Sequence, residues 1–195
     1  MEINEKTVDA WISYWKDYIG EYSLPSWDQI PDFGLYMEQA VTFLRNCFSY
    51  MDSDDNPVIT ASAINNYVRK KYIPQPEKKR YYRRHLAYLI ILCALKQSLS
   101  IAEIQTLLPM EIDDKLLSKT YDSFTLQHKR AAEYFIGRME TIKEMIKSDR
   151  GLESIFKDNA TDIVVDVALI ASYAKILSEK LVSGAPVVPE AAEED

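Results

Sequence analysis

The residues best suited to chemistry in this sequence are cations that gather in one short segment. Positions 69–84 hold eight of the 23 lysines and arginines and a single acidic residue, Glu77. The 195-residue chain carries a formal net charge of −7, so the remainder of the sequence is strongly acidic. Positive charge confined to one stretch is typical of surfaces that bind phosphate groups. The segment therefore predicts a phosphate-binding surface.

A helix with one polar side comes directly before most of these cations. Ile64, Tyr67 and Val68 share one side of a helix that we expect to begin after Thr60 and to be closed by Pro74. The opposite side carries asparagines, which are suited to bidentate contacts with adenine in the major groove, whereas lysine and arginine suit phosphates or the minor groove. The pattern predicts contact with double-stranded DNA.

Each part of this surface has an expected role. The bases would be approached by Asn65, Asn66, Arg69 and Lys70. Ser62 at the helix start would contact a phosphate, and residues 78–84 would hold the DNA backbone. A charged segment that is merely solvated remains the alternative. The candidate DNA-binding residues are Ser62, Asn65, Asn66, Arg69, Lys70, Lys78, Lys79, Arg80, Tyr81, Arg83 and Arg84.

The elements that must position these residues are mostly helices. Residues 78–82 include two tyrosines and favour extended structure, so we expect a small β-hairpin wing there. Residues 83–97 are nearly all apolar and predict a central, buried helix. Ser100 and Glu103 form a capping box that begins a short helix, which Pro109 closes.

Further helices are predicted on both sides of this region. Residues 5–22 form an aromatic amphipathic stripe, and Asp32 is expected to cap a helix that runs to about residue 49. Residues 113–147 space apolar side chains almost as heptads, and residues 160–182 repeat that pattern. The predicted regions are 1–30, an aromatic helix and linker; 31–110, the DNA-binding region; 111–183, a helical dimerisation region; and 184–195, a disordered acidic tail.

Several other classes of protein fit the sequence poorly. The longest apolar run, residues 86–95, is well short of the ~20 residues needed to cross a bilayer, and the polar N-terminus does not resemble a signal peptide. Cys47 and Cys93 lack CxxC or CxxH partners and are expected to be reduced thiols in a cytoplasmic protein. The acidic run 52–56 resembles the start of an EF-hand loop, but Pro57 and Ala63 replace its required Gly and Glu. No catalytic motif is present, so we expect no enzyme, metal or other cofactor, and no membrane partner.

Three blocks of sequence resemble known families. Residues 24–39, LPSWDQIPDFGLYMEQ, residues 64–81, INNYVRKKYIPQPEKKRY, and residues 85–104, HLAYLIILCALKQSLSIAEI, are similar to a bacterial family of unknown function, the YkrK-like proteins. The order of helix, proline break, basic wing and buried helix also resembles a MerR-like winged helix-turn-helix. The resemblance implies a mostly α-helical transcriptional regulator that consists of such a domain and a long-helix hairpin.

Two departures from the MerR pattern matter. The wing is shorter and lacks the usual Asn-Gly turn, and Asn65 and Asn66 stand where MerR proteins tend to carry Arg and Tyr. The MerR rules for reading a groove therefore do not transfer. The C-terminal half also lacks the cysteines of metal-sensing MerR proteins.

The long near-heptad helix raises the question of a homodimer. It could pack only on the last helix of its own chain, or it could form a seam with a second chain through Phe135, Met139 and Ile142. Two half-sites would multiply specificity, which favours the dimer. The sequence thus predicts a sequence-specific DNA-binding transcriptional regulator that acts as a dimer. A protein-interaction module that docks an acidic partner, or a regulator that senses an unidentified small-molecule effector, are the alternatives.

Overall fold

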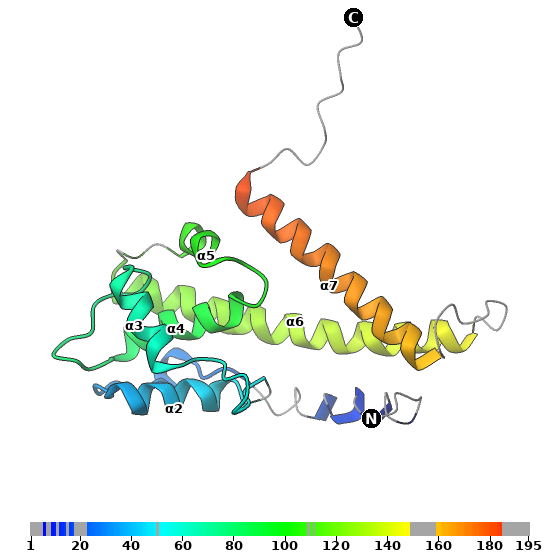
Figure 1. Ribbon diagram of the computed structural model, residues 1–195, viewed down its shortest axis with the longest axis horizontal. Coiled ribbons are helices and arrows are strands. Elements are labelled where there is room, and N and C mark those ends of the chain that lie inside the picture. Colours follow the sequence, from blue (N-terminus) through cyan, green and yellow to red (C-terminus); the bar gives the residue numbers. More distant parts are fainter. Residues whose placement is uncertain are drawn as a thin grey trace, which may run out of the picture. The chain divides into compact units, whose positions relative to one another are not determined.

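The computed structural model is predominantly helical (Figure 1). The helices are α2 (Met37–Cys47), α3 (Ala61–Arg69), α4 (Arg83–Leu95), α5 (Ile101–Leu107), α6 (Asp114–Ser148) and α7 (Asn159–Ser183), preceded by a 3-10 turn, η1 (Trp27–Gln29). The structure describes residues 6, 9–10, 12–14, 16–17, 23–49, 51–108, 110, 112–148 and 159–184. Of residues 142–148 and 159–163 it describes the backbone alone. The predicted mostly α fold is confirmed.

The chain divides into two compact units. One unit contains Pro25–Thr125 together with Leu177–Asp195, and the other contains Met1–Leu24 together with Leu126–Ile176. The first unit holds all the candidate DNA-binding residues. Within the second, the described residues of the expected 5–22 helix are helical, and Lys16 forms an exposed ion pair with Glu140 at 2.9 Å. Most of the aromatic stripe, and residues 185–195 of the expected acidic tail, lie outside the described residues.

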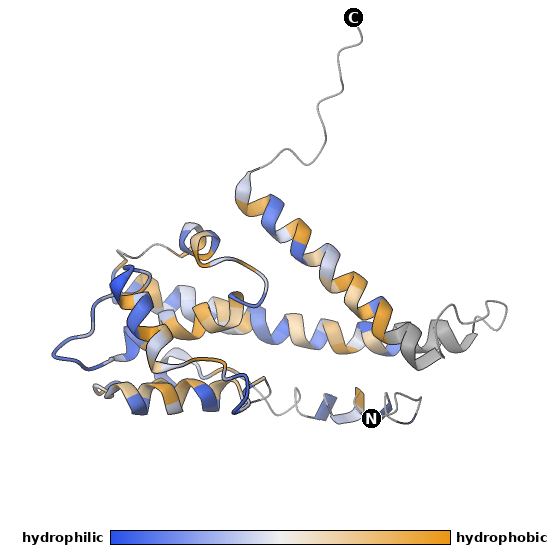
Figure 2. Ribbon diagram, in the orientation of Figure 1, coloured by the Kyte–Doolittle hydropathy of each residue, from blue (hydrophilic) through white to orange (hydrophobic). Residues whose placement is uncertain are grey.

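Helix α4 is the centre of the first unit. All nine residues from His85 to Cys93 are buried, which agrees with the prediction from its apolar composition and with its largely orange ribbon in Figure 2. Helices α2 and α5 both pack against it, and α3 packs on α2. Burial raises the pKa of the Cys47 and Cys93 thiols to about 12, so both remain protonated at neutral pH.

The first turns of α6 complete this core. Leu117 and Tyr121 are fully buried, and the Tyr121 hydroxyl donates a hydrogen bond to the Pro25 carbonyl at 2.8 Å. The Trp27 amide donates to the Asp122 carboxylate at 2.9 Å, which joins η1 to the same face of α6. These contacts join the beginning of the segment Pro25–Thr125 to its end on α6.

The local start signals of two helices act as the sequence predicts. The Thr60 hydroxyl accepts a hydrogen bond from the Ala63 amide and begins α3, and Ser100 with Glu103 forms the capping box of α5. Helix α2, however, begins at Met37 rather than after Asp32. The reason is that Leu35 is paired with Tyr81 through two backbone hydrogen bonds of 2.8 and 2.9 Å, which keep the chain extended up to Tyr36.

The predicted β-wing is wrong as stated. Among the described residues there are only two isolated β-bridges in this region, Leu35 with Tyr81 and Glu77 with Arg80, and no strand. Pro74 and Pro76 lack amide donors, and Tyr82 is already the N-cap of α4, so too few residues remain for a ladder. A tight turn at residues 77–80 takes the place of the wing. No described helix is both long and apolar enough to cross a membrane.

Candidate nucleic-acid interface

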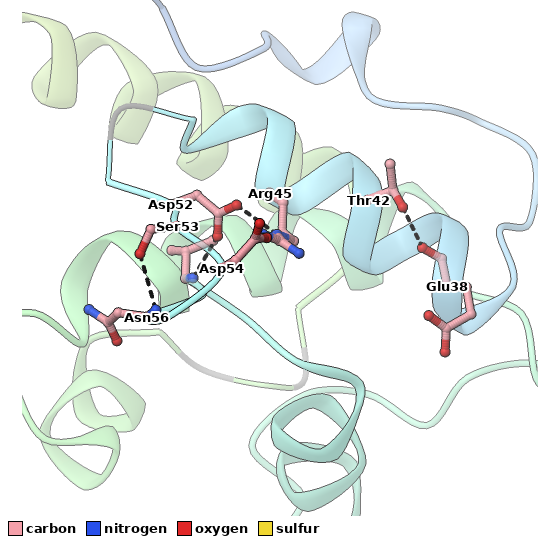
Figure 3. Close-up of polar contacts among 8 residues, drawn as sticks. Glu38, Thr42, Arg45, Asp52, Ser53, Asp54 and Asn56 are labelled. Atoms are coloured by element: carbon pink, nitrogen blue, oxygen red, sulfur yellow. Dashed lines mark hydrogen bonds and ion pairs between the residues drawn. The ribbon is translucent and has the colours of Figure 1, made fainter.

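The loop before α3 is organised by an arginine of α2. The Arg45 side chain pairs with the Asp52 carboxylate at 2.6 Å and with Asp54 at 2.9 Å (Figure 3). The second oxygen of Asp52 accepts a hydrogen bond from the Val58 amide at 2.8 Å, and Lys96 of α4 donates to the Val58 carbonyl. The acidic run that resembles a calcium loop therefore joins α2 and α4 to the segment that enters α3.

Helix α3 buries one side and exposes the other, as predicted. Ile64 and Tyr67 are buried, whereas Ser62, Asn65 and Arg69 are exposed. The exposed side borders an open hollow of about 570 Å³, lined among the described residues by Thr60, Ser62, Ala63, Asn65, Asn66 and Arg69. Four of the eleven candidate DNA-binding residues thus lie on the same open surface.

The two asparagines of this surface differ. The Asn66 side-chain oxygen accepts a hydrogen bond from the Arg69 guanidinium at 2.9 Å, and Asn66 is half-buried. Asn65 is exposed, and the contacts between described residues include none from its side chain. An asparagine that reads a base needs both its amide donor and its carbonyl acceptor. Asn65 has both available, whereas Arg69 already occupies one lone pair of the Asn66 oxygen.

Helix α3 ends in a Schellman motif that contains an unusual residue. The Tyr72 amide donates to the Tyr67 carbonyl at 2.8 Å, and the Lys71 amide donates to the Val68 carbonyl at 3.0 Å. Lys71 has φ +57°, a left-handed conformation that glycine usually supplies at this position. Gln105 of α5 donates to the Lys71 carbonyl at 3.4 Å, which links this end of α3 to the next helix but one.

The turn that replaces the wing also has left-handed lysines. Glu77 and Arg80 exchange backbone hydrogen bonds of 2.9 and 3.1 Å across Lys78 and Lys79, whose φ angles are +49° and +63°. Two central residues with positive φ are the pattern of a type I′ turn, for which Asn-Gly is the favoured sequence. Both lysines are exposed. The turn places two lysines next to each other at its tip.

Arg80 holds this turn to the strand-like segment before α2. Its guanidinium lies 4.7 Å from the centre of the Tyr36 ring and donates to the Tyr36 hydroxyl at 2.9 Å. Gly34 makes room for this contact, because a β-carbon there would come within 2.8 Å of the Arg80 β-carbon and 2.9 Å of the Tyr82 ring. A larger residue at position 34 would push the turn away.

The last two cations of the cluster are bound to the framework. Arg83 donates to the Ile30 carbonyl at 2.9 Å, and its guanidinium lies 5.8 Å from the centre of the Trp27 ring. Arg84 pairs with Asp114 of α6 at 3.3 Å. Both arginines stand in the first turn of α4, where the helix dipole disfavours positive charge, so nearby acceptors offset that cost.

Tyr81 and His85 are also structural. Tyr81 is only 3% exposed, so its ring does not reach solvent. The His85 ring accepts a hydrogen bond from the Tyr82 amide at Nδ1 (3.0 Å), which leaves Nε2–H to donate to the Gln75 carbonyl at 2.9 Å. The buried imidazole therefore joins both ends of the segment that carries the turn.

The structure thus divides the predicted site. Eight of the candidates remain on or beside the surface, although Arg80 is partly engaged, whereas Tyr81, Arg83 and Arg84 belong to the framework. Sequence reasoning missed Lys71, which is exposed and adjacent to Lys70. The signal was its position just after the last helical residue, where a glycine is usual, but that signal requires the helix end to be known to the residue.

These features lie within the part of the chain that a family model matches. The model describes a domain of unknown function, DUF1836, and covers residues 25–124, just over half of the 195 residues. The chain belongs to this family. The matched range includes η1, helices α2 to α5 and the buried first turns of α6, which together form the core of the first unit. No curated protein and no solved structure matches the chain.

Proposed function

We propose that this protein is a sequence-specific DNA-binding transcriptional regulator that acts as a homodimer. The observation that carries the proposal is the combination of an exposed Asn65 on α3 with the exposed lysines that follow it. Asn65 can offer a donor and an acceptor to a base edge, and the lysines can neutralise phosphates. The resemblance to YkrK-like and MerR-like regulators supports the same reading.

The proposal treats the DNA-binding part as a shortened relative of the MerR-like winged helix-turn-helix. Helix α3 would enter the major groove and the turn at residues 77–80 would contact the backbone where a wing normally does. The connection from α2 to α3, residues 48–60, is longer than the usual turn of a helix-turn-helix. Arg45 and Asp52 would compensate by fixing that connection.

Binding of labelled duplexes, selected from a pool of genomic fragments, tests the proposal directly. Each neutralised phosphate contributes ~0.9 to the slope of log K against log salt, so four to five contacts predict a slope of about −4. A selected duplex should bind at least about 1,000-fold more tightly than an unrelated one at physiological salt. A protein that enriches no fragment and shows no salt-dependent duplex binding would instead fit the interaction module.

Exposed apolar surface supports the homodimer. Phe135 is 45% exposed although it stands on the predicted seam, and Met139 is half-buried; the side chain of Ile142 is outside those described. Helix α7 exposes apolar residues along its length: Val164, Leu169, Ile170, Tyr173, Ile176, Leu177 and Leu181. Soluble proteins rarely leave that much apolar surface uncovered. A second copy of the chain would cover it.

Light scattering at tens of micromolar protein tests this part. The wild-type chain should be a dimer, and Phe135→Glu should be a monomer or insoluble, because a charge buried without a partner costs several kcal/mol. Tyr134→Glu is the matched control, since Tyr134 is 76% exposed and lies off the seam. A monomeric wild-type protein would remove the dimer from the proposal and leave the seam to intramolecular packing.

A further inference from the structure

Lysines occupy all three left-handed positions that non-glycine residues take in the described part of the chain. They are Lys71, Lys78 and Lys79, with φ of +57°, +49° and +63°. Residues with a β-carbon are disfavoured there, and the usual residues are Gly, Asn and Asp. The three lysines lie within nine residues, and at each of these positions the β-carbon makes the folded protein less stable.

Within the part of the chain that the structure describes, no contact uses these three charges. All three side chains are exposed, and none of them takes part in an ion pair or hydrogen bond between described residues. The neighbouring cations differ, since Arg69 bonds Asn66, Arg80 bonds Tyr36, and Lys70 lies 5.9 Å from the Tyr72 ring centre. Lys78 and Lys79 are adjacent like charges, which adds repulsion rather than stability.

The backbones of the same three residues are firmly held. The Schellman hydrogen bonds and Gln105 fix Lys71, and the paired hydrogen bonds of Glu77 and Arg80 fix the other two. His85 of α4 holds both ends of the segment around Lys78 and Lys79, through Gln75 and Tyr82. Because the backbone of each lysine is already fixed, less conformational entropy is lost when its side chain binds.

We infer that Lys71, Lys78 and Lys79 form a phosphate clamp for duplex DNA that is kept at the expense of stability. The inference rests on the proposed function and adds Lys71 to its site. Backbone strain at an exposed, otherwise unused side chain points to a role in binding. The clamp contacts phosphates rather than bases, so it contributes to affinity on any duplex and leaves sequence preference to α3.

Glycine substitution separates this role from an ordinary surface lysine, because stability and binding should move in opposite directions. Lys71→Gly should raise the melting temperature by roughly 2–4 °C for a chain of this size. It should also flatten the slope of log K against log salt by ~0.9 on a selected duplex. Lys78→Asn with Lys79→Gly, which installs the favoured type I′ pair, should also raise the melting temperature and should flatten the slope by ~1.8.

Two variants serve as controls. Lys70→Gly removes the same charge from a residue in an ordinary conformation, φ −84° and ψ 3°, so its melting temperature should fall or stay unchanged. Lys71→Arg keeps the charge and the strain, so both the melting temperature and the salt slope should match the wild type.

Each outcome is decisive. A lower melting temperature in both glycine-containing variants would overturn the claim that these lysines reduce stability. An unchanged salt slope on a duplex that the wild type binds would overturn only the claim that they contact phosphates. A wild-type protein that binds no duplex would overturn the proposed function, and the clamp with it.

Discussion

Lys78 and Lys79 stand only a few residues before Arg83 and Arg84, and the sequence gives the two pairs the same charge. The structure places the two pairs in different surroundings. The lysines are exposed at the tip of a turn, whereas Arg83 holds the Ile30 carbonyl and Arg84 holds Asp114 of α6. The difference follows from what each pair can reach: the turn projects from the unit, while the first turn of α4 lies beside η1 and α6. A cluster of like charges can therefore contain both exposed residues and residues that hold the framework together.

The largest effect on general duplex affinity should come from removing the lysine pair. Lys78→Ala with Lys79→Ala should flatten the salt slope by up to ~1.8, which at about 0.1 M salt corresponds to roughly 60-fold weaker duplex binding. The melting temperature should not fall, because no contact between described residues uses these charges. Titration of a labelled duplex at several salt concentrations measures the change. Lys119→Ala with Lys180→Ala, which removes the same charge from exposed positions on α6 and α7, should leave the slope as it was.

Substitution of the α3 asparagines should affect preference rather than general affinity. Asn65→Ala should weaken binding to the selected duplex by ~1–3 kcal/mol and barely change binding to an unrelated duplex. Asn66→Ala should affect both duplexes alike, because Asn66 positions Arg69. Competition between the two duplexes distinguishes these results. Equal losses on both duplexes for Asn65→Ala would show that this residue reads no base.

The framework arginines should show the reverse behaviour. Arg83→Ala should lower the free energy of unfolding by about 1–2 kcal/mol, because it leaves the carbonyl of the buried Ile30 without this donor and removes the contact with Trp27. The salt slope of duplex binding should be unchanged in the folded protein. Arg83→Lys, which keeps the charge and a donor, should lose less stability in denaturant titrations. A flattened slope in folded Arg83→Ala would place Arg83 in the interface.

The smallest effect should come from displacing the turn without altering its charge. Gly34→Ala places a methyl group against Arg80 and Tyr82 and should cost about 1 kcal/mol of stability. Duplex binding should weaken slightly, because the turn that carries the lysines is displaced. The salt slope should be unchanged, because both lysines remain. The comparison with Lys78→Ala plus Lys79→Ala then separates the position of the turn from its charge. Identical binding by Gly34→Ala would mean that the turn tolerates displacement.

Much of the architecture followed from the order of residues. The capped start of α3, the capping box of α5 and the apolar run of α4 each depend on contacts within a few positions, so local pattern was sufficient to predict them. The apolar and polar sides of α3 were predicted for the same reason. The predicted start of α2 failed because it depends on Leu35 meeting Tyr81, a pairing between segments far apart in the chain. The predicted wing failed because Pro74, Pro76 and the N-cap at Tyr82 leave too few residues for a ladder.

The sequence by itself determined that this protein is mostly helical, that α4 is buried, and that positive charge is confined to residues 69–84. It also determined which side of α3 faces outward, because helical periodicity needs no tertiary partner. Only the tertiary structure decided which cations are available. Arg83 and Arg84 are engaged because folding brings Ile30 and Asp114 to them. Lys71, Lys78 and Lys79 are exposed because no described group packs against their side chains, although their backbones take left-handed conformations that local propensity would assign to glycine or asparagine. Charge is a property of the residue, but whether it is available depends on which distant atoms lie beside it.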